Sequence, residues 1–145
     1  MVLGYLLHDR PGELVPTDSA LGAGWYDTGD IVSLDKAGFV RIEGRAKRFA
    51  KVGGEMVSLA AVEELAARVW PGALHAVVSV PDPQKGEQLV LITEQAGAER
   101  AELSAFARQD GIGEISVPRQ IVITTAVPLL GTGKIDYAAA RALVA

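Results

Sequence analysis

The sequence contains no cysteine among its 145 residues. Disulfides, thiolate metal sites and a cysteine nucleophile are therefore excluded, and the absence fits a reducing compartment, so we expect a cytoplasmic protein. Only two histidines are present, His8 and His75, and their separation matches no metal-ligand spacing. We therefore predict no metal ligands in this chain.

An excess of positive charge and long apolar runs are also missing. The net charge of −4 argues against a general nucleic-acid binder, which carries a basic surplus. The longest apolar runs, such as residues 76–80 and 89–92, are too short to cross a bilayer. The first residues lack a basic segment followed by a long apolar core, so the sequence predicts no signal peptide.

Hydrophobic periodicity predicts a small α+β fold. An irregular arm, residues 1–24, precedes a hairpin made of strands 31–34 and 39–42. A second hairpin, 49–57, turns at Gly53-Gly54, a pair suited to positive φ angles. The remaining elements are expected to be a helix at 59–69, strands at 74–80 and 88–93, a helix at 99–108, a strand at 120–125 and a helix at 135–144. The order favours a hairpin plus a sheet of about three strands with helices packed on it, and the natural boundary lies at residues 44–48.

Two short segments carry candidate chemistry. Asp30 ends the turn Tyr26-Asp-Thr-Gly-Asp30, and a carboxylate there can accept hydrogen bonds from a vicinal diol such as a ribose. A simple turn aspartate is the other interpretation. Lys134 follows Gly131-Thr-Gly133, which lacks the spacing of a Walker-type phosphate loop. This lysine is either an ordinary exposed residue before a helix or a flexibly tethered charge for a transition state.

A basic segment lies between these two. It contains Arg41, Arg45, Lys47, Arg48 and Lys51. Such runs are usually solvated loops. The functional alternatives are an arginine that binds ribose or phosphate, a hinge at Lys47, and a docking patch for an acidic partner.

The order of the motifs resembles the adenylate-forming superfamily of acyl-CoA synthetases and peptide-synthetase adenylation domains. The resemblance rests on Gly24-Trp-Tyr-Asp-Thr-Gly-Asp30, Gly44-Arg45, Lys51-x-x-Gly54, Val62-Glu63, Val78-Ser-Val-Pro-Asp82 with Gly86-Glu87, and Pro128 to Lys134. It implies that residues 1–46 are the tail of a nucleotide-binding N-terminal portion and 47–145 a mobile C-terminal lid domain. It also implies a two-step reaction in which a carboxylate is first adenylated by ATP and then transferred to a thiol.

The resemblance assigns roles to individual residues. Asp30 should hold the ribose hydroxyls, with Thr28 and Arg45 also binding the nucleotide. Lys47 occupies the hinge position, and Gly53 and Gly54 should line the pantetheine channel. Lys134 should be the catalytic lysine of the first step. ATP and Mg²⁺ would be bound mainly by an N-terminal portion that this sequence lacks, so we expect the chain alone to be inactive.

A narrower resemblance links residues 44–59 and 127–134 to the synthetase end of bifunctional 2-acylglycerophosphoethanolamine acyltransferase/acyl-[acyl-carrier-protein] synthetases. It implies a fatty acid substrate, acyl carrier protein as partner, a role in phospholipid reacylation, and an intact parent at the inner membrane facing the cytoplasm. Lys47, Arg48 and Asp136 depart from the residues usual in the superfamily. The alternatives are the C-terminal domain of an acyl-CoA synthetase and a non-catalytic module that binds a carrier protein.

Overall fold

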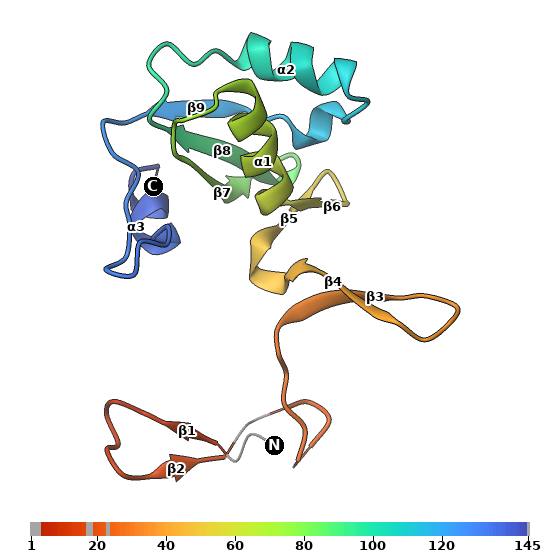
Figure 1. The fold of residues 1–145 in the computed structure, drawn as a ribbon, viewed down its shortest axis with the longest axis vertical. Coiled ribbons are helices and arrows are strands. Elements are labelled where there is room, and N and C mark those ends of the chain that lie inside the picture. Colours follow the sequence, from red (N-terminus) through yellow and green to blue (C-terminus); the bar gives the residue numbers. More distant parts are fainter. Residues whose placement is uncertain (1–3, 17–18, 23, 145) are drawn as a thin grey trace. The chain divides into compact units, whose positions relative to one another are not determined.

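The computed structural model describes residues 4–16, 19–22 and 24–144. The chain forms two compact units, Met1–Ala46 and Lys47–Ala145 (Figure 1). Each unit has its own hydrogen-bonded sheets, and the second also has helices on both faces of its sheet.

The first unit consists of two antiparallel hairpins. Strand β1 (Tyr5–Leu6) pairs with β2 (Leu14–Val15), and β3 (Asp30–Leu34) pairs with β4 (Val40–Arg45). The second pairing confirms the predicted hairpin. Its turn is closed by Asp35, whose Oδ1 accepts from the amides of Ala37 at 2.8 Å and Phe39 at 2.9 Å. The expected irregular arm therefore contains one short pairing, while residues 1–3, 17, 18 and 23 of that arm lie outside the described residues.

The second unit is built on a five-stranded sheet with the order β6-β5-β8-β7, and β9 also pairs with β8. The strands are β5 (Phe49–Val52), β6 (Glu55–Ser58), β7 (His75–Asp82), β8 (Gly86–Thr93) and β9 (Gln120–Ile123). Strand β7 is antiparallel to β8, whereas β9 is parallel to it. The β5–β6 hairpin joins this sheet where Val52 pairs with Gly86. The predicted α+β class is confirmed.

Both faces of the sheet are covered, which explains the nearly continuous apolar sequence of β7 and β8. Helices α1 (Leu59–Val69) and α2 (Arg100–Gln109) pack on the face that carries Val77, Leu89 and Leu91. Helix α3 (Tyr137–Ala142) packs with Val127 on the opposite face, which carries Ala76, Val78, Val90 and Ile92 (Figure 1). The sheet therefore separates two small cores.

Helix α3 is shorter than the predicted helix 135–144. It begins later because Ile135 is used in a bridge with Leu129, and Asp136 becomes the N-cap. The Asp136 carboxylate accepts from the amides of Ala138 and Ala139, both at 3.0 Å. Capping of this kind satisfies donors that the first turn of a helix leaves open.

Two polar side chains of the second unit have structural roles. Ser58 caps α1 by accepting from the amide of Ala61. His75 is a core histidine, with Nδ1 2.9 Å from Thr93 Oγ1 and Nε2 3.1 Å from the carbonyl of Trp70. In the described part of the chain, no helix has the length and apolar content needed to cross a membrane.

Candidate functional site

The first candidate region is the turn before β3. Asp27 Oδ1 accepts from the amide of Gly29 at 2.8 Å, and Thr28 Oγ1 accepts from the amide of Asp30 at 3.2 Å. Gly29 has a φ of +67°, a conformation that a residue with a Cβ adopts at a cost. These bonds fix the direction in which the chain enters β3 at Asp30.

The hairpin register places Asp30 opposite Arg45. Arg45 Nε lies 2.9 Å from Asp30 Oδ1, and Arg45 Nη1 donates to the carbonyl of Thr28 at 2.8 Å. The Asp30 side chain is 18% exposed and the Arg45 side chain 67%. The structure therefore brings together the three residues that the sequence predicted for nucleotide binding. The carboxylate has one oxygen on the guanidinium, and within the described residues its other oxygen has no hydrogen-bond partner, so it can accept from a hydroxyl.

The second candidate region begins at the short 3₁₀ turn η1 (Ala46–Arg48). Lys47, the predicted hinge residue, is exposed there. Arg48 is not: its side chain is 18% exposed, and its Nη2 lies 2.6 Å from Glu63 Oε1. Its guanidinium also lies 3.8 Å from the centre of the Tyr137 ring.

These contacts correct the interpretation of the basic segment as one docking patch. Arg48 is held inside the second unit, and Arg45 is paired with Asp30. A guanidinium that is already paired and partly desolvated contributes little to an encounter with an acidic partner. Within the second unit, the exposed cations of that segment are Lys47 and Lys51.

The third candidate region is the turn between β5 and β6. Val52 pairs with Glu55, so Gly53 and Gly54 form the two-residue turn that the sequence predicts. Their φ values are +60° and +92°, which suits the primed turns of hairpins. The amide of Gly53 donates to the carbonyl of Lys85 at 2.9 Å, which ties this turn to the loop between β7 and β8. The channel role of the two glycines remains a prediction.

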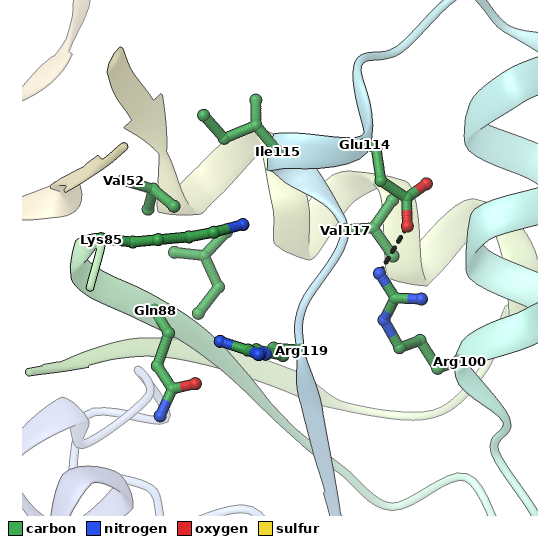
Figure 2. Close-up of a pocket in the computed structure, with 9 residues that line it drawn as sticks. Val52, Lys85, Gln88, Arg100, Glu114, Ile115, Val117 and Arg119 are labelled. Atoms are coloured by element: carbon green, nitrogen blue, oxygen red, sulfur yellow. Dashed lines mark hydrogen bonds and ion pairs between the residues drawn. The ribbon is translucent and has the colours of Figure 1, made fainter. Parts of the chain in front are cut away.

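A pocket of about 310 Å³ lies beside this turn. It is lined by Val52, Lys85, Gln88, Leu89, Arg100, Glu114, Ile115, Val117 and Arg119. Figure 2 shows the Lys85 and Arg119 side chains extending into the space between the β7–β8 loop and residues 114–119, whereas Arg100 turns to Glu114. Sequence reasoning missed this group because its cations come from three separate segments.

Two carboxylates that contact cations of the pocket have lowered pKa values. Asp82 has its pKa lowered, first by the amide of Lys85 at 2.8 Å and then by the amide of Gln84. The Arg119 guanidinium, 3.2 Å from Asp82 Oδ2, acts in the same direction. Arg100 likewise lowers the pKa of Glu114. Among the three cations of the pocket, Lys85 has no carboxylate partner within the described residues, which leaves a cation for an anionic ligand.

The fourth candidate region is the loop that carries Lys134. It is a tight hairpin: the amide of Leu130 donates to the carbonyl of Lys134 at 2.7 Å, and the amide of Gly133 donates to the carbonyl of Leu130 at 2.8 Å. Gly133 has a φ of +80°. Residues 129–134 are all exposed, and the Lys134 ammonium has no ion-pair partner in the part of the chain that the structure describes. The loop therefore presents a cation to solvent on a short, well-defined support.

No metal site accompanies these regions. In the residues described, no three His, Asp or Glu side chains gather closely enough to hold an ion.

Comparison with known proteins decides the family. Residues 61–134, just over half of the chain, match the AMP-binding enzyme C-terminal domain. The chain belongs to this family. The AMP-binding enzyme C-terminal domain is part of adenylate-forming ligases, so the superfamily resemblance of the sequence is confirmed.

Individual relatives agree with the assignment. The chain is 39% identical over 139 residues to a 3-methylmercaptopropionyl-CoA ligase of Ruegeria pomeroyi. The matched segment covers 93% of this chain and 25% of the relative. It is 37% identical to a 2,3-dihydroxybenzoate-AMP ligase of Bacillus subtilis, over 81% of this chain and 22% of the relative. The structure resembles an ATP-bound RpMatB-BxBclM chimera with a TM-score of 0.65 and 27% identity, over 81% of this chain and 24% of that one.

The chain thus spans about a quarter of the length of the relatives it matches. These relatives are acyl-CoA and aryl-acid ligases, and they support the family rather than the narrower bifunctional acyl-carrier-protein synthetase. The AMP-binding enzyme C-terminal domain therefore fixes the superfamily and leaves the acceptor open.

Proposed function

We propose that this chain supplies the C-terminal part of an ATP-dependent acid–thiol ligase, with coenzyme A as the acceptor and Lys134 as the catalytic cation. The observation that carries the proposal is that Lys134, at the end of the matched segment, is exposed and has no ion-pair partner among the described residues. The CoA ligase among the relatives supports the choice of acceptor. In this proposal, residues 1–46 continue a nucleotide-binding portion, and 47–145 is the mobile lid with its hinge at Lys47.

In the first step, a carboxylate oxygen of the acid attacks the α-phosphorus of ATP. The bond between that phosphorus and the bridging oxygen breaks, pyrophosphate leaves, and an acyl-adenylate remains. Negative charge grows on the phosphoryl oxygens in the transition state, and the Lys134 ammonium stabilises it. Asp30 accepts from the ribose hydroxyls, while Arg45 holds the carboxylate by its 2.9 Å contact.

In the second step, the thiol sulfur attacks the acyl carbon. The carbon–oxygen bond to AMP breaks, AMP leaves, and the thiol proton passes to solvent. The lid domain rotates between the two steps, in the way that mobile lids open and close the active sites of other enzymes. Gly53 and Gly54 then allow the pantetheine arm to approach the backbone closely. The neighbouring pocket with Lys85 and Arg119 offers cations for the phosphates of coenzyme A.

The decisive experiment replaces Lys134 by alanine in the intact ligase. We expect ATP–pyrophosphate exchange to fall about a hundred- to thousand-fold, roughly 3–4 kcal/mol of transition-state stabilisation. Transfer from a preformed acyl-adenylate to the thiol should change much less, because that step leaves the lysine outside the site. Lys36→Ala, in the exposed turn of the β3–β4 hairpin, is the matched control and should behave as the wild type.

Full exchange activity in Lys134→Ala would overturn the proposal and favour the non-catalytic module. The 145-residue chain by itself is a second control, and we expect it to give no exchange. Exchange by the chain alone would mean that the active site has been assigned to the wrong part of the ligase.

A carrier protein is the second candidate acceptor, as in an acyl-[acyl-carrier-protein] synthetase that acts on fatty acids. The observation in its favour is the exposed set Lys47, Lys51 and Lys85 in the second unit, because complementary charge speeds the encounter with an acidic protein. Supplying the adenylated enzyme with coenzyme A and with a phosphopantetheine-bearing carrier protein separates the two. Faster transfer to the carrier, lost at high salt, would favour this second candidate.

A further inference from the structure

We propose that Tyr137 is a positioning residue for Lys134, and that Arg48 and Glu63 form the socket that holds it. The inference rests on the proposed function of Lys134 and adds the means by which its loop is fixed to the domain. Neither side chain of the socket touches the reacting atoms in this proposal.

The socket is a closed group of short contacts. Arg48 Nη2 lies 2.6 Å from Glu63 Oε1, and the Tyr137 hydroxyl donates to Glu63 Oε2 at 3.2 Å. The Arg48 guanidinium stacks on the Tyr137 ring at 3.8 Å. Tyr137 is thus held by its ring and by its hydroxyl at the same time, which fixes its orientation more strongly than either contact alone.

The socket is itself anchored to the central sheet. Glu63 Oε1 also accepts from the amide of Val77 at 2.8 Å, and Arg48 Nη1 donates to the carbonyl of Val77 at 3.0 Å. The side chains of Arg48 and Glu63 are only 18% and 16% exposed. Removing one partner of such a pair leaves the other charge poorly compensated, so the group resists rearrangement.

The Lys134 loop has few contacts of its own. The hydrogen bonds that define it run between backbone groups of residues 128–136, such as Asp136 N to Pro128 O at 2.9 Å. Its placement on the domain therefore depends on the residues at its two ends. Before the loop, Val127 is buried and its amide donates to Glu94 at 2.8 Å. After the loop, Tyr137 enters the socket three residues beyond Lys134.

The socket also lies next to the proposed hinge. Arg48 directly follows Lys47, so the Tyr137 contact joins the segment after the hinge to the segment after the catalytic lysine. When the lid turns at Lys47, the lysine loop is then carried as part of one rigid body. A loosely held loop would instead arrive at the nucleotide in a range of orientations.

Two substitutions at Tyr137 separate the contacts. Tyr137→Phe removes only the hydroxyl bond to Glu63, whereas Tyr137→Leu also removes the ring under Arg48. In the intact ligase we expect Tyr137→Leu to lower kcat for adenylate formation about tenfold or more, since misplacing a catalytic group by about 1 Å costs up to roughly a hundredfold. The KM for ATP should stay within about twofold, and Tyr137→Phe should show a smaller fall in kcat.

A destabilising control is Leu103→Val, which truncates a fully buried side chain of α2, a helix that carries no socket residue. It should leave kcat unchanged although it lowers stability. In the 145-residue chain, Tyr137→Leu should also accelerate hydrogen exchange at the amides of Leu130, Gly133 and Asp136, while the amides of β8 stay protected.

Three outcomes would overturn the inference: kcat of Tyr137→Leu within about twofold of wild type, an equal fall in Leu103→Val, or unchanged exchange in the loop. They differ from a failure of the proposed function, which would appear as full activity in Lys134→Ala. The exchange measurement needs no ligase activity at all and so tests the socket independently.

Discussion

The two units of the chain have similar hydrogen-bonded turns, but they differ in how many of their side chains are buried. In Lys47–Ala145, residues such as Val77, Leu91 and Leu103 are completely buried. In Met1–Ala46, no described residue is buried, and Leu34 and Phe39 on the β3–β4 hairpin are 70% and 73% exposed. Regular backbone structure is therefore present in both units, whereas a hydrophobic core is present in one.

This difference in burial separates the contribution of local hydrogen bonds from that of hydrophobic packing. An isolated two-stranded hairpin is marginally stable in water, because its hydrogen bonds replace those with the solvent and little apolar area is removed from water. The sheet in the second unit buries both of its faces, which is the dominant favourable term in folding. We infer that cooperative unfolding of the chain reports mainly on Lys47–Ala145.

The largest expected effect comes from paired core and hairpin truncations. Leu91→Ala in β8 should lower the free energy of unfolding by about 2–5 kcal/mol, because it removes buried methyl groups and leaves a cavity. Leu34→Ala in β3 should change it by less than about 0.5 kcal/mol, since its side chain is already in water. Urea unfolding followed by circular dichroism measures both. A comparable loss in Leu34→Ala would show that the hairpin is covered and contributes to the same cooperative transition.

The sequence predicted the elements that local signals define. Gly53-Gly54 marked a tight turn, the helical spacing of apolar residues marked the helix at 59–69, and the strand-like runs 31–34 and 39–42 marked a hairpin. These features depend on residues close in sequence, or on a register set by a short turn.

The sequence could not predict features that depend on distant segments. Arg48 looked like an exposed cation because its partners, Glu63 and Tyr137, lie 15 and 89 positions away. Helix α3 started later than predicted because Ile135 bridges to Leu129 across the lysine loop. The cations of the pocket, Lys85, Arg100 and Arg119, come together only when the β7–β8 loop, α2 and the segment before β9 are assembled.

A second, smaller effect compares one type of interaction in the two units. Asp136 and Asp35 each accept from two backbone amides, the first at the N-terminus of α3 and the second in the β3–β4 turn. Asp136→Ala should cost about 1 kcal/mol of global stability, the usual value of a helix cap. Asp35→Ala should leave global stability unchanged and only speed hydrogen exchange within its own hairpin. Equal thermal shifts in the two variants would contradict the assignment of cooperativity to the second unit.

The smallest effect concerns the pH dependence of stability, and it arises within Lys47–Ala145, the unit with the hydrophobic core. Glu87 in β8 has its pKa lowered below the ordinary value of 4.5, first by the Ser79 hydroxyl at 2.6 Å and then by the amide of Lys51 at 2.6 Å. A carboxyl group whose pKa is lower in the folded state stabilises the fold above its unfolded pKa, and this stability is lost as pH falls through the folded pKa. We therefore expect Glu87→Gln to be less stable than wild type at neutral pH and to lose less stability below about pH 4.5.

Glu64→Gln, at an exposed position of α1, is the matched control. Its stability should fall with decreasing pH in the same way as that of the wild type. If the unfolding free energies of Glu87→Gln and wild type fell equally with decreasing pH, the Ser79 and Lys51 contacts would not favour the charged form of Glu87. The acid sensitivity of this unit would then arise at Asp82 and Glu114, whose pKa values are also lowered.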